Sequence, residues 1–214
     1  MSETLEKPNQ NIEAGRRRIS TRDMALIPLF SLLVGIGAMI RIPLPFSPVP
    51  LTLQTAMVFA AGLLLGSRRG ALALLAYMVM GLLGLPVFTG GGGLHNLMLP
   101  SFGFIVGFIG TAWTAGRICE LASGWVARQS RRGVAALAVR IVACLAGGAI
   151  YNVVGVLWLY MNVNYILGKA ATFHQVLVMG LFPFLLPDLL KLAAVALVVS
   201  LIAERVKALD LFDA

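Results

Sequence analysis

The feature that most constrains this chain is a series of six long apolar stretches that carry almost no charge. They occupy residues 24–40, 51–66, 70–85, 101–119, 135–161 and 176–203. Each comes near the 17–25 residues, roughly, that an α-helix needs to cross the hydrocarbon core of a bilayer. Barrel strands would instead be short and alternating. A hydrophobic content of 59% is typical of no soluble domain. We therefore expect an all-α integral membrane protein with six transmembrane helices.

The basic residues lie mainly on one side of these predicted spans. Of the 17 Lys and Arg residues, 13 flank the spans on a single side. These are Lys7, Arg16, Arg17, Arg18, Arg22, Arg68, Arg69, Arg117, Arg128, Arg131, Arg132, Arg205 and Lys207. Only Arg41 and Lys169 fall on the other side, while Arg140 is near enough to the basic end of its span to snorkel. By the positive-inside rule both termini are predicted to be cytoplasmic.

This topology divides the chain into three parts. We expect a cytoplasmic tail at 1–23, a membrane domain at 24–203 and a second cytoplasmic tail at 204–214. The net charge of +8 is then explained by topology and by contact with anionic membrane lipid, so nucleic acid is an unnecessary partner. The N-terminal residues are polar and lead into an uncleaved span, which is unlike a secretory signal.

Two opposite charges lie inside the last predicted span, at Asp188 and Lys191. Charge in hydrocarbon costs roughly 2.5–3.5 kcal/mol per residue on insertion scales, so such a pair is a functional-site hypothesis. Pro187 favours a helix that begins near this residue, which puts Asp188 in its first turn, facing outward. Three residues are close to one turn, so both side chains share a face. The alternative is an ion pair that only holds this helix to its neighbours.

The two connections on the outer side differ from those on the basic side. Residues 42–50 contain four prolines, which exclude a helix. Residues 85–100 contain the run Gly90–Gly93, which permits close backbone approach to a ligand and leaves amide groups free to bind it. We expect these two loops to cap a ligand pocket at the outer face.

Several kinds of chemistry lack their residues. The run Gly90–Gly93 is not followed by the Gly-Lys-Ser/Thr of a Walker loop, so no ATPase motif is present. No second catalytic carboxylate, nucleophile–base pair or metal constellation accompanies Asp188, so we expect no enzyme. His95 and His174 lack a metal-spaced partner, and Cys119 and Cys144 read as small buried hydrophobic residues. We predict neither a metal nor a cofactor.

Four segments carry a family resemblance. They are Ile42-Pro-Leu-Pro-Phe-Ser-Pro-Val-Pro-Leu-Thr-Leu-Gln-Thr55, Ala61-Gly-Leu-Leu-Leu-Gly-Ser-Arg-Arg-Gly-Ala-Leu-Ala73, Gly84-Leu-Pro-Val-Phe88 and Pro183-Phe-Leu-Leu-Pro-Asp-Leu-Leu-Lys191. Together they resemble the BioY family, the biotin-specific S components of energy-coupling factor (ECF) transporters. The resemblance implies a multi-pass protein of the bacterial inner (cytoplasmic) membrane. Such a protein captures biotin outside and works with a transmembrane coupling subunit and cytosolic ATPase subunits.

Biotin has an apolar bicyclic body, a urea group and a carboxylate tail, and the candidate residues suit these parts. Asp188 can accept from urea N–H groups, and Lys191 can donate to the urea carbonyl or to the tail. Amide side chains and aromatic rings can supply further bonds and cover the apolar body. The predicted biotin-binding residues are Asp188, Lys191, Tyr151, Gln54, Asn152, Phe88, Gly91, Gly92 and Gly93.

The resemblance also includes two departures from the family pattern. The family's Ala-x-x-x-Ala patch for the coupling subunit aligns with Ser31 and Gly35. We expect a contact there, and ordinary packing within the bundle is the alternative. Phe104 stands where the family has tyrosine, so a polar role at this position is in doubt. An autonomous biotin carrier or ion-coupled porter remains the alternative function, although one internal acidic residue is little for a proton cycle.

The charge bias makes a direct prediction about topology. In a variant with Cys119 and Cys144 replaced by alanine, a cysteine introduced at Ala214 should resist a membrane-impermeant maleimide added to intact cells. A cysteine at Ser47, in the predicted outer loop, should react. Reaction at position 214 from outside would contradict the predicted orientation.

Overall fold

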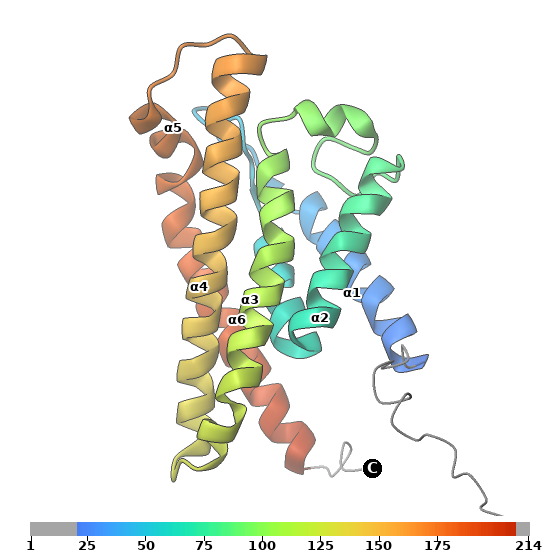
Figure 1. The fold of residues 1–214 in the computed structure, drawn as a ribbon, viewed down its shortest axis with the longest axis vertical. Helices are drawn as coiled ribbons and strands as arrows, with labels where there is room; N and C mark the ends of the chain where they lie inside the picture. Colours follow the sequence, from blue (N-terminus) through green and yellow to red (C-terminus); the bar gives the residue numbers. More distant parts are fainter. Residues whose placement is uncertain (1–20, 209–214) are drawn as a thin grey trace, which may run out of the picture.

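Long helices make up most of the structure, a computed structural model that describes residues 21–208 (Figure 1). The helices are α1 (Thr21–Met39), α2 (Gln54–Leu82), α3 (Phe102–Ala127), α4 (Arg132–Met161), α5 (Phe173–Gly180) and α6 (Phe182–Ala208). A short 3₁₀ helix, η2 (Leu94–Met98), precedes α3, and a π-helical turn, η3 (Asn162–Ile166), follows α4. The predicted tail at 1–23 lies mostly outside the described residues, and so does much of the tail at 204–214.

The helices have the length and composition of membrane spans. Within residues 21–208, the helical stretches 54–82, 102–127, 132–166 and 173–203 are each long and apolar enough to cross a bilayer, and the apolar helix at 23–39 is shorter. The strands β1 (Arg41–Ile42) and β2 (Leu51–Thr52) form one small antiparallel hairpin. The expectation of an all-helical membrane protein is therefore confirmed.

Helix α2 is interrupted at Gly66, whose φ of 79° and ψ of −178° are not helical. The two arms fold back on each other, because Gly70 lies against Ala61 and Gln54 is hydrogen-bonded to Tyr77. The predicted spans 51–66 and 70–85 correspond to these arms. At 1.5 Å per residue the arms are about 18 and 24 Å long, less than the ~30 Å hydrocarbon core. That each arm crosses the bilayer stays a prediction.

The Gly66 turn is held in place by carboxylates of two neighbouring helices. Glu120 of α3 accepts from the Ser67 amide at 2.7 Å and from the Ser67 hydroxyl at 2.9 Å. Asp23 of α1 forms an ion pair with Arg69 at 2.8 Å. These contacts tie the turn to both neighbours, so the position of the α2 arms depends on polar groups at this end of the bundle.

The two ends of the bundle differ in composition. In Figure 1 the beginning of α1, the end of α6, the turn inside α2 and the α3–α4 connection lie at one end. The β1–β2 hairpin and η2 lie at the opposite end. The arginine-rich connections therefore share one end, and the proline-rich and glycine-rich connections share the other.

Close packing of α3 against α4 positions the middle of α4. A Cβ atom added to Gly107 would lie 2.6 Å from the Tyr151 Cα, and one added to Gly155 would lie 2.2 Å from the Phe104 ring. These two glycines thus let the helix backbones approach, as small residues do in membrane proteins. The result is that Tyr151 and Phe104 lie next to each other, with ring centroids 6.2 Å apart.

Helix α6 begins earlier than predicted. It starts at Phe182 and contains Pro187, so the expected start near Pro187 is wrong and Asp188 lies in the second turn. Pro183 occupies the first turn, where an amide N–H has no helical partner in any case. Pro187 then removes only the bond to the Pro183 carbonyl, a loss that a helix can tolerate near its N-terminus.

Substitution of Gly66 tests whether this turn holds the two arms of α2 together. Gly66→Ala should lower stability by about 1–3 kcal/mol, because this backbone region is nearly restricted to glycine and a Cβ atom would crowd Glu120 at 2.8 Å. Gly124→Ala in α3 is the matched control, since nothing lies within 4 Å of its added Cβ. Thermal unfolding in detergent measures the melting temperatures of both variants. Equal melting temperatures for the two variants would contradict a structural role for the turn.

Candidate functional site

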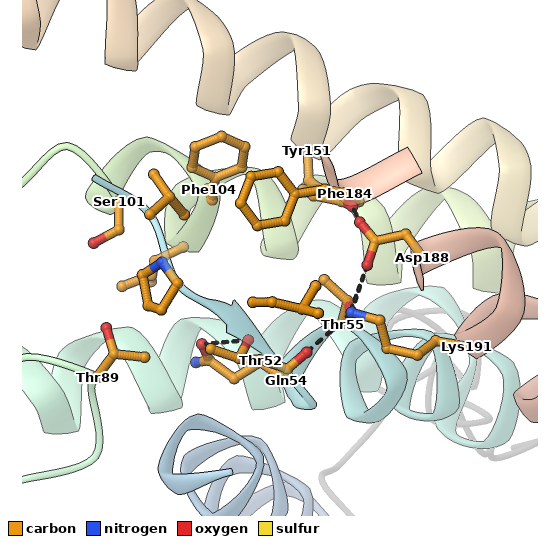
Figure 2. Close-up of a pocket in the computed structure, with 14 residues that line it drawn as sticks. Thr52, Gln54, Thr55, Thr89, Ser101, Phe104, Tyr151, Phe184, Asp188 and Lys191 are labelled. Atoms are coloured by element: carbon orange, nitrogen blue, oxygen red, sulfur yellow. Dashed lines mark hydrogen bonds and ion pairs between the residues drawn. The ribbon is translucent and has the colours of Figure 1, made fainter. Parts of the chain in front are cut away.

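The ammonium group of Lys191 is surrounded by three oxygen acceptors (Figure 2). Its Nζ lies 2.5 Å from Asp188 Oδ1, 2.9 Å from the Thr52 carbonyl and 2.6 Å from Thr55 Oγ1. An ammonium has three N–H donors, so the protein itself can satisfy all of them. A ligand that binds Lys191 must therefore replace one of these contacts.

Asp188 completes the network. Its Oδ1 accepts from Thr55 Oγ1 at 3.2 Å, and its Oδ2 accepts from the Tyr151 hydroxyl. The side chains of Lys191 and Asp188 are only 15% and 12% exposed. A charge pair with so little solvent is stable only when its remaining valences are also bonded. The hydroxyls of Thr55 and Tyr151 meet that requirement.

The network joins elements that are distant in sequence. Asp188 and Lys191 come from α6, Thr55 from the first turn of α2, Thr52 from β2 and Tyr151 from α4. The N-terminus of α2 is held close to α1 by the Leu53 amide, which donates to the Gly37 and Ile40 carbonyls. These polar contacts thus connect the β1–β2 hairpin to helices α2, α4 and α6.

A narrow cavity of about 50 Å³ lies beside this network. Its lining, shown as sticks in Figure 2, consists of Val49, Pro50, Leu51, Thr52, Gln54, Thr55, Thr89, Ser101, Phe104, Ile105, Tyr151, Phe184, Asp188 and Lys191. A water molecule needs roughly 10–15 Å³ of such space, so a bicyclic ligand would have to displace side chains or loops. The charged pair lies at one side of the cavity, and the rings of Phe104 and Phe184 lie across from the hairpin strand.

Gln54 is held in a second chain of hydrogen bonds. Its Nε2 donates to the Tyr77 hydroxyl at 2.6 Å, and its Oε1 accepts from Thr52 Oγ1 at 3.2 Å. The Tyr77 hydroxyl donates onward to the Val87 carbonyl at 3.2 Å. The amide of Gln54 is thereby fixed at the cavity wall. Four of the predicted residues, Asp188, Lys191, Tyr151 and Gln54, line one cavity, and their contact with biotin stays a prediction.

The glycine-rich loop does not present its amides to the cavity. The Gly91 amide donates to the Phe88 carbonyl at 3.1 Å, and the Gly93 amide donates to the Gly81 carbonyl at 2.8 Å. Gly92 faces the carbonyls of Gly84 and Leu85 and does not line the cavity. The expectation of free amides at Gly91 and Gly93 is wrong, because positive φ angles of 94° and 112° fold this loop back on itself.

Two other predicted residues lie away from this cavity. Phe88 packs edge-on against Tyr77, with centroids 5.3 Å apart, and is 5% exposed. Asn152 lines a neighbouring cavity between α4 and α6, to which Tyr151 and Asp188 also contribute, and its Nδ2 donates to the Gly148 carbonyl at 2.9 Å. Its Oδ1 is buried without a hydrogen bond inside the described part of the chain. Direct ligand contact stays a prediction at both positions, and the geometry does not favour it at Phe88.

Ser31 and Gly35 pack inside the bundle. The Ser31 hydroxyl donates to the Ala73 carbonyl at 2.7 Å, and this side chain is fully buried. A Cβ atom added to Gly35 would lie 3.2 Å from the Val87 Cβ. This is the packing alternative that the sequence left open. A coupling contact here stays a prediction, and it would require α1 to move away from α2.

Sequence reasoning missed several residues of the site. Thr55 contacts both members of the charged pair, and Phe184 lines the cavity one turn before Asp188. Both could have been found, since Thr55 follows Gln54 and Phe184 shares a helix face with Asp188. Phe104 also lines the cavity, so this position contributes apolar surface rather than a hydroxyl.

The loops above the cavity are joined by Arg41. Its Nη1 donates to the Thr89 carbonyl, which connects β1 to the glycine-rich loop. Thr89 and residues 49–52 both line the cavity, so the two loops contribute to one wall. At the far side, Trp158 Nε1 donates to the Leu99 carbonyl at 3.0 Å and Asn162 Nδ2 to the Met98 carbonyl at 2.7 Å. These contacts hold the segment around η2 to the end of α4.

Comparisons with known proteins agree on one family. The sequence profile described as the BioY family matches residues 9–208. The probable biotin transporter BioY of Lysinibacillus sphaericus is 35% identical over 186 residues, which is 87% of each chain. The biotin transporter BioY of Rhodobacter capsulatus is 38% identical over 187 residues, 86% of this chain and 94% of that one.

A solved structure shares the fold. It is the S-component for biotin from an ECF-type ABC transporter, with a TM-score of 0.71 and 25% sequence identity. The match covers 86% of this chain and 91% of the other. The family resemblance seen in the sequence is confirmed.

The network predicts how stability responds to loss of charge. Lys191→Met should lower stability by about 3–5 kcal/mol, because Asp188 is left as an uncompensated charge. The double variant Asp188→Asn with Lys191→Met should recover most of this loss, since no buried charge remains. Thermal unfolding in detergent measures the stability of the wild type, the single variant and the double variant. A double variant as unstable as Lys191→Met would contradict mutual neutralisation.

Proposed function

Because the chain belongs to the BioY family, we propose that it is a biotin-binding S component that captures biotin at the outer face of the cytoplasmic membrane. Its ATP-driven partners would be a transmembrane coupling subunit and cytosolic ATPase subunits. The names of the relatives and of the matched structure support biotin as the substrate. The observation that carries the proposal is the paired Asp188 and Lys191 beside a cavity walled by two loops and two phenylalanines.

The chemistry of this site suits the urea group. An ionised Asp188 can accept from the two urea N–H groups in place of the hydroxyls of Thr55 and Tyr151. Lys191 can donate to the urea oxygen or to the carboxylate tail in place of the Thr52 carbonyl. The number of bonds at the charged pair is then conserved. The ligand exchanges contacts and leaves no buried charge without a partner.

The apolar lining suits the bicyclic body of biotin. Phe104, Phe184 and Tyr151 present aromatic surface, and Ile105 and Val49 add aliphatic contacts. A site with mostly apolar walls and a few convergent polar groups is typical of small-molecule pockets. We therefore assign the body of the ligand to the aromatic side and the urea to the charged side.

Entry of biotin requires the site to widen. The hairpin loop and the glycine-rich loop are joined by the Arg41–Thr89 contact, and Lys191 holds Thr52. Release of these two contacts would separate the loops from each other and the hairpin from Lys191 without breaking a helix. We propose that these loops form the outer gate, with α3, α4 and α6 as the rigid part of the site.

The proposed coupling is tested separately from binding. Co-purification of this chain with coupling and ATPase subunits, and biotin uptake that stops when those subunits are deleted, would support it. Undiminished uptake by the chain alone would instead favour the autonomous carrier.

The proposed site predicts which substitutions affect binding. Asp188→Asn and Lys191→Met should each weaken biotin binding by roughly 10- to 150-fold, since each removes a charge-assisted hydrogen bond. Their double variant should fold but not recover affinity. Gly124→Ala is the control and should bind as the wild type does, because Gly124 does not line the cavity and nothing lies within 4 Å of its added Cβ.

Calorimetry on detergent-purified protein measures these affinities. Binding of thiamine or riboflavin in place of biotin would contradict the proposed substrate. Near-normal biotin binding by the double variant would show that the charged pair is purely structural.

A further inference from the structure

A third cavity lies at the arginine-rich end of the bundle, far from the loops. It has a volume of about 440 Å³ and is walled by the last turns of α3, the first turns of α4 and the end of α6. Helices α3 and α6 make very few contacts with each other, and in Figure 1 the end of α6 diverges from α4 at this level. The cavity lies in the space between these helices.

Two arginines point to the chemistry of this cavity. Arg132 and Arg140 both line it, together with the polar residues Ser123 and Ser200. The two arginines are eight residues apart, which places Arg140 about 12 Å further along the α4 axis. Val134 and Val142, on either side of Arg140 in sequence, are 65% and 57% exposed on the apolar surface of this membrane helix. Arg140 is thus a positive charge at the depth of lipid-facing side chains.

The contacts of Arg140 leave its charge without a described anionic partner. Its Nη1 donates to Ser200 Oγ at 2.7 Å, and Ser200 itself donates to the Ala196 carbonyl. A guanidinium has five N–H donors and is always charged. No Asp or Glu is among the residues that line the cavity in the described part of the chain.

The nearest acidic residue of α3 faces elsewhere. Glu120 is next to Cys119 in sequence, but its carboxylate accepts from Ser67 and pairs with Arg117. It does not line the cavity. The cavity thus combines the basic lining of Arg132 and Arg140 with apolar walls formed by Val126, Ala136 and Val139.

We propose that this cavity binds the headgroup of an anionic glycerophospholipid, with the phosphate between Arg132 and Arg140. Arginine binds phosphate oxygens through paired N–H donors. Basic pockets between transmembrane helices on the cytoplasmic side suit such headgroups. The apolar walls contact the glycerol and the beginning of the acyl chains. This lipid neutralises Arg140 within the membrane and fills the space between α3 and α6.

Cys119 provides a reporter, because it lines the cavity while Cys144 is fully buried. The experiment measures maleimide labelling of Cys119 by peptide mass spectrometry in nanodiscs. One set contains phosphatidylcholine alone and the other contains phosphatidylcholine with increasing phosphatidylglycerol. We expect phosphatidylglycerol to slow the labelling of the wild-type protein. Equal rates in the two lipids would overturn the proposal.

Three variants test whether the effect of phosphatidylglycerol on labelling arises at this cavity. In Arg140→Gln and Arg132→Gln, the amount of phosphatidylglycerol that halves the labelling rate should rise at least about 10-fold, since a charge-assisted hydrogen bond is lost. Arg128→Gln is the matched control, because Arg128 is exposed and does not line the cavity. An equal rise in all three variants would indicate general surface charge and overturn the site. Arg132 lies at the exposed edge, so its variant tests the proposal even if Arg140→Gln does not fold.

One further arm distinguishes a lipid from free phosphate as the source of the anion. Inorganic phosphate added to phosphatidylcholine nanodiscs should not slow labelling, and protection by phosphate alone would overturn the lipid assignment. Biotin binding should be unchanged in Arg132→Gln, which separates this site from the proposed function.

Discussion

The ammonium of Lys191 requires three acceptors inside a membrane protein, and the outer half of the structure is arranged to supply them. Asp188 comes from the same helix, but the Thr52 carbonyl and the Thr55 hydroxyl come from the other end of the sequence. A carbonyl of strand β2 is available only because the residues after α1 are extended. The charge on α6 therefore depends on the proline-rich loop, and the position of that loop depends on the charge.

The backbone of both outer loops is satisfied in a similar way. Prolines remove amide donors from residues 42–50, which reduces the number of groups that need partners near the membrane surface. In the glycine-rich loop the amides remain, and they bond to carbonyls of the same segment and of Gly81. Both solutions produce compact loops that need few contacts with each other. Arg41 links the two loops to each other, and Lys191 links the β1–β2 hairpin to α6, each through one side chain, which is an arrangement that can open.

The sequence predicts helices well here because lipid leaves the backbone few alternatives. The stretches 24–40 and 135–161 agree with α1 and α4 to within about three residues at either end. The direction of individual side chains was harder to predict. Asn152 follows Tyr151, and neighbours on a helix point about 100° apart. If Tyr151 faces Asp188, Asn152 must face the next groove. The hydrogen bonds of Gly91 and Gly93 depend on positive φ angles that composition alone does not specify.

Lys191 and Arg140 lie at opposite ends of the bundle, and their positive charges are stabilised in the apolar region by different means. Lys191 is a compact ammonium with three donors, and a carboxylate, a hydroxyl and a carbonyl of the protein can surround it completely. Arg140 has a planar guanidinium with more donors, and the described protein supplies one hydroxyl acceptor from Ser200. A charged group whose hydrogen bonds are all made within the protein can bind a ligand only when the ligand replaces one of those bonds. This suits a site for a specific ligand. A group that the fold satisfies in part needs an acceptor from its surroundings, and in a membrane the abundant acceptor at that depth is a lipid headgroup.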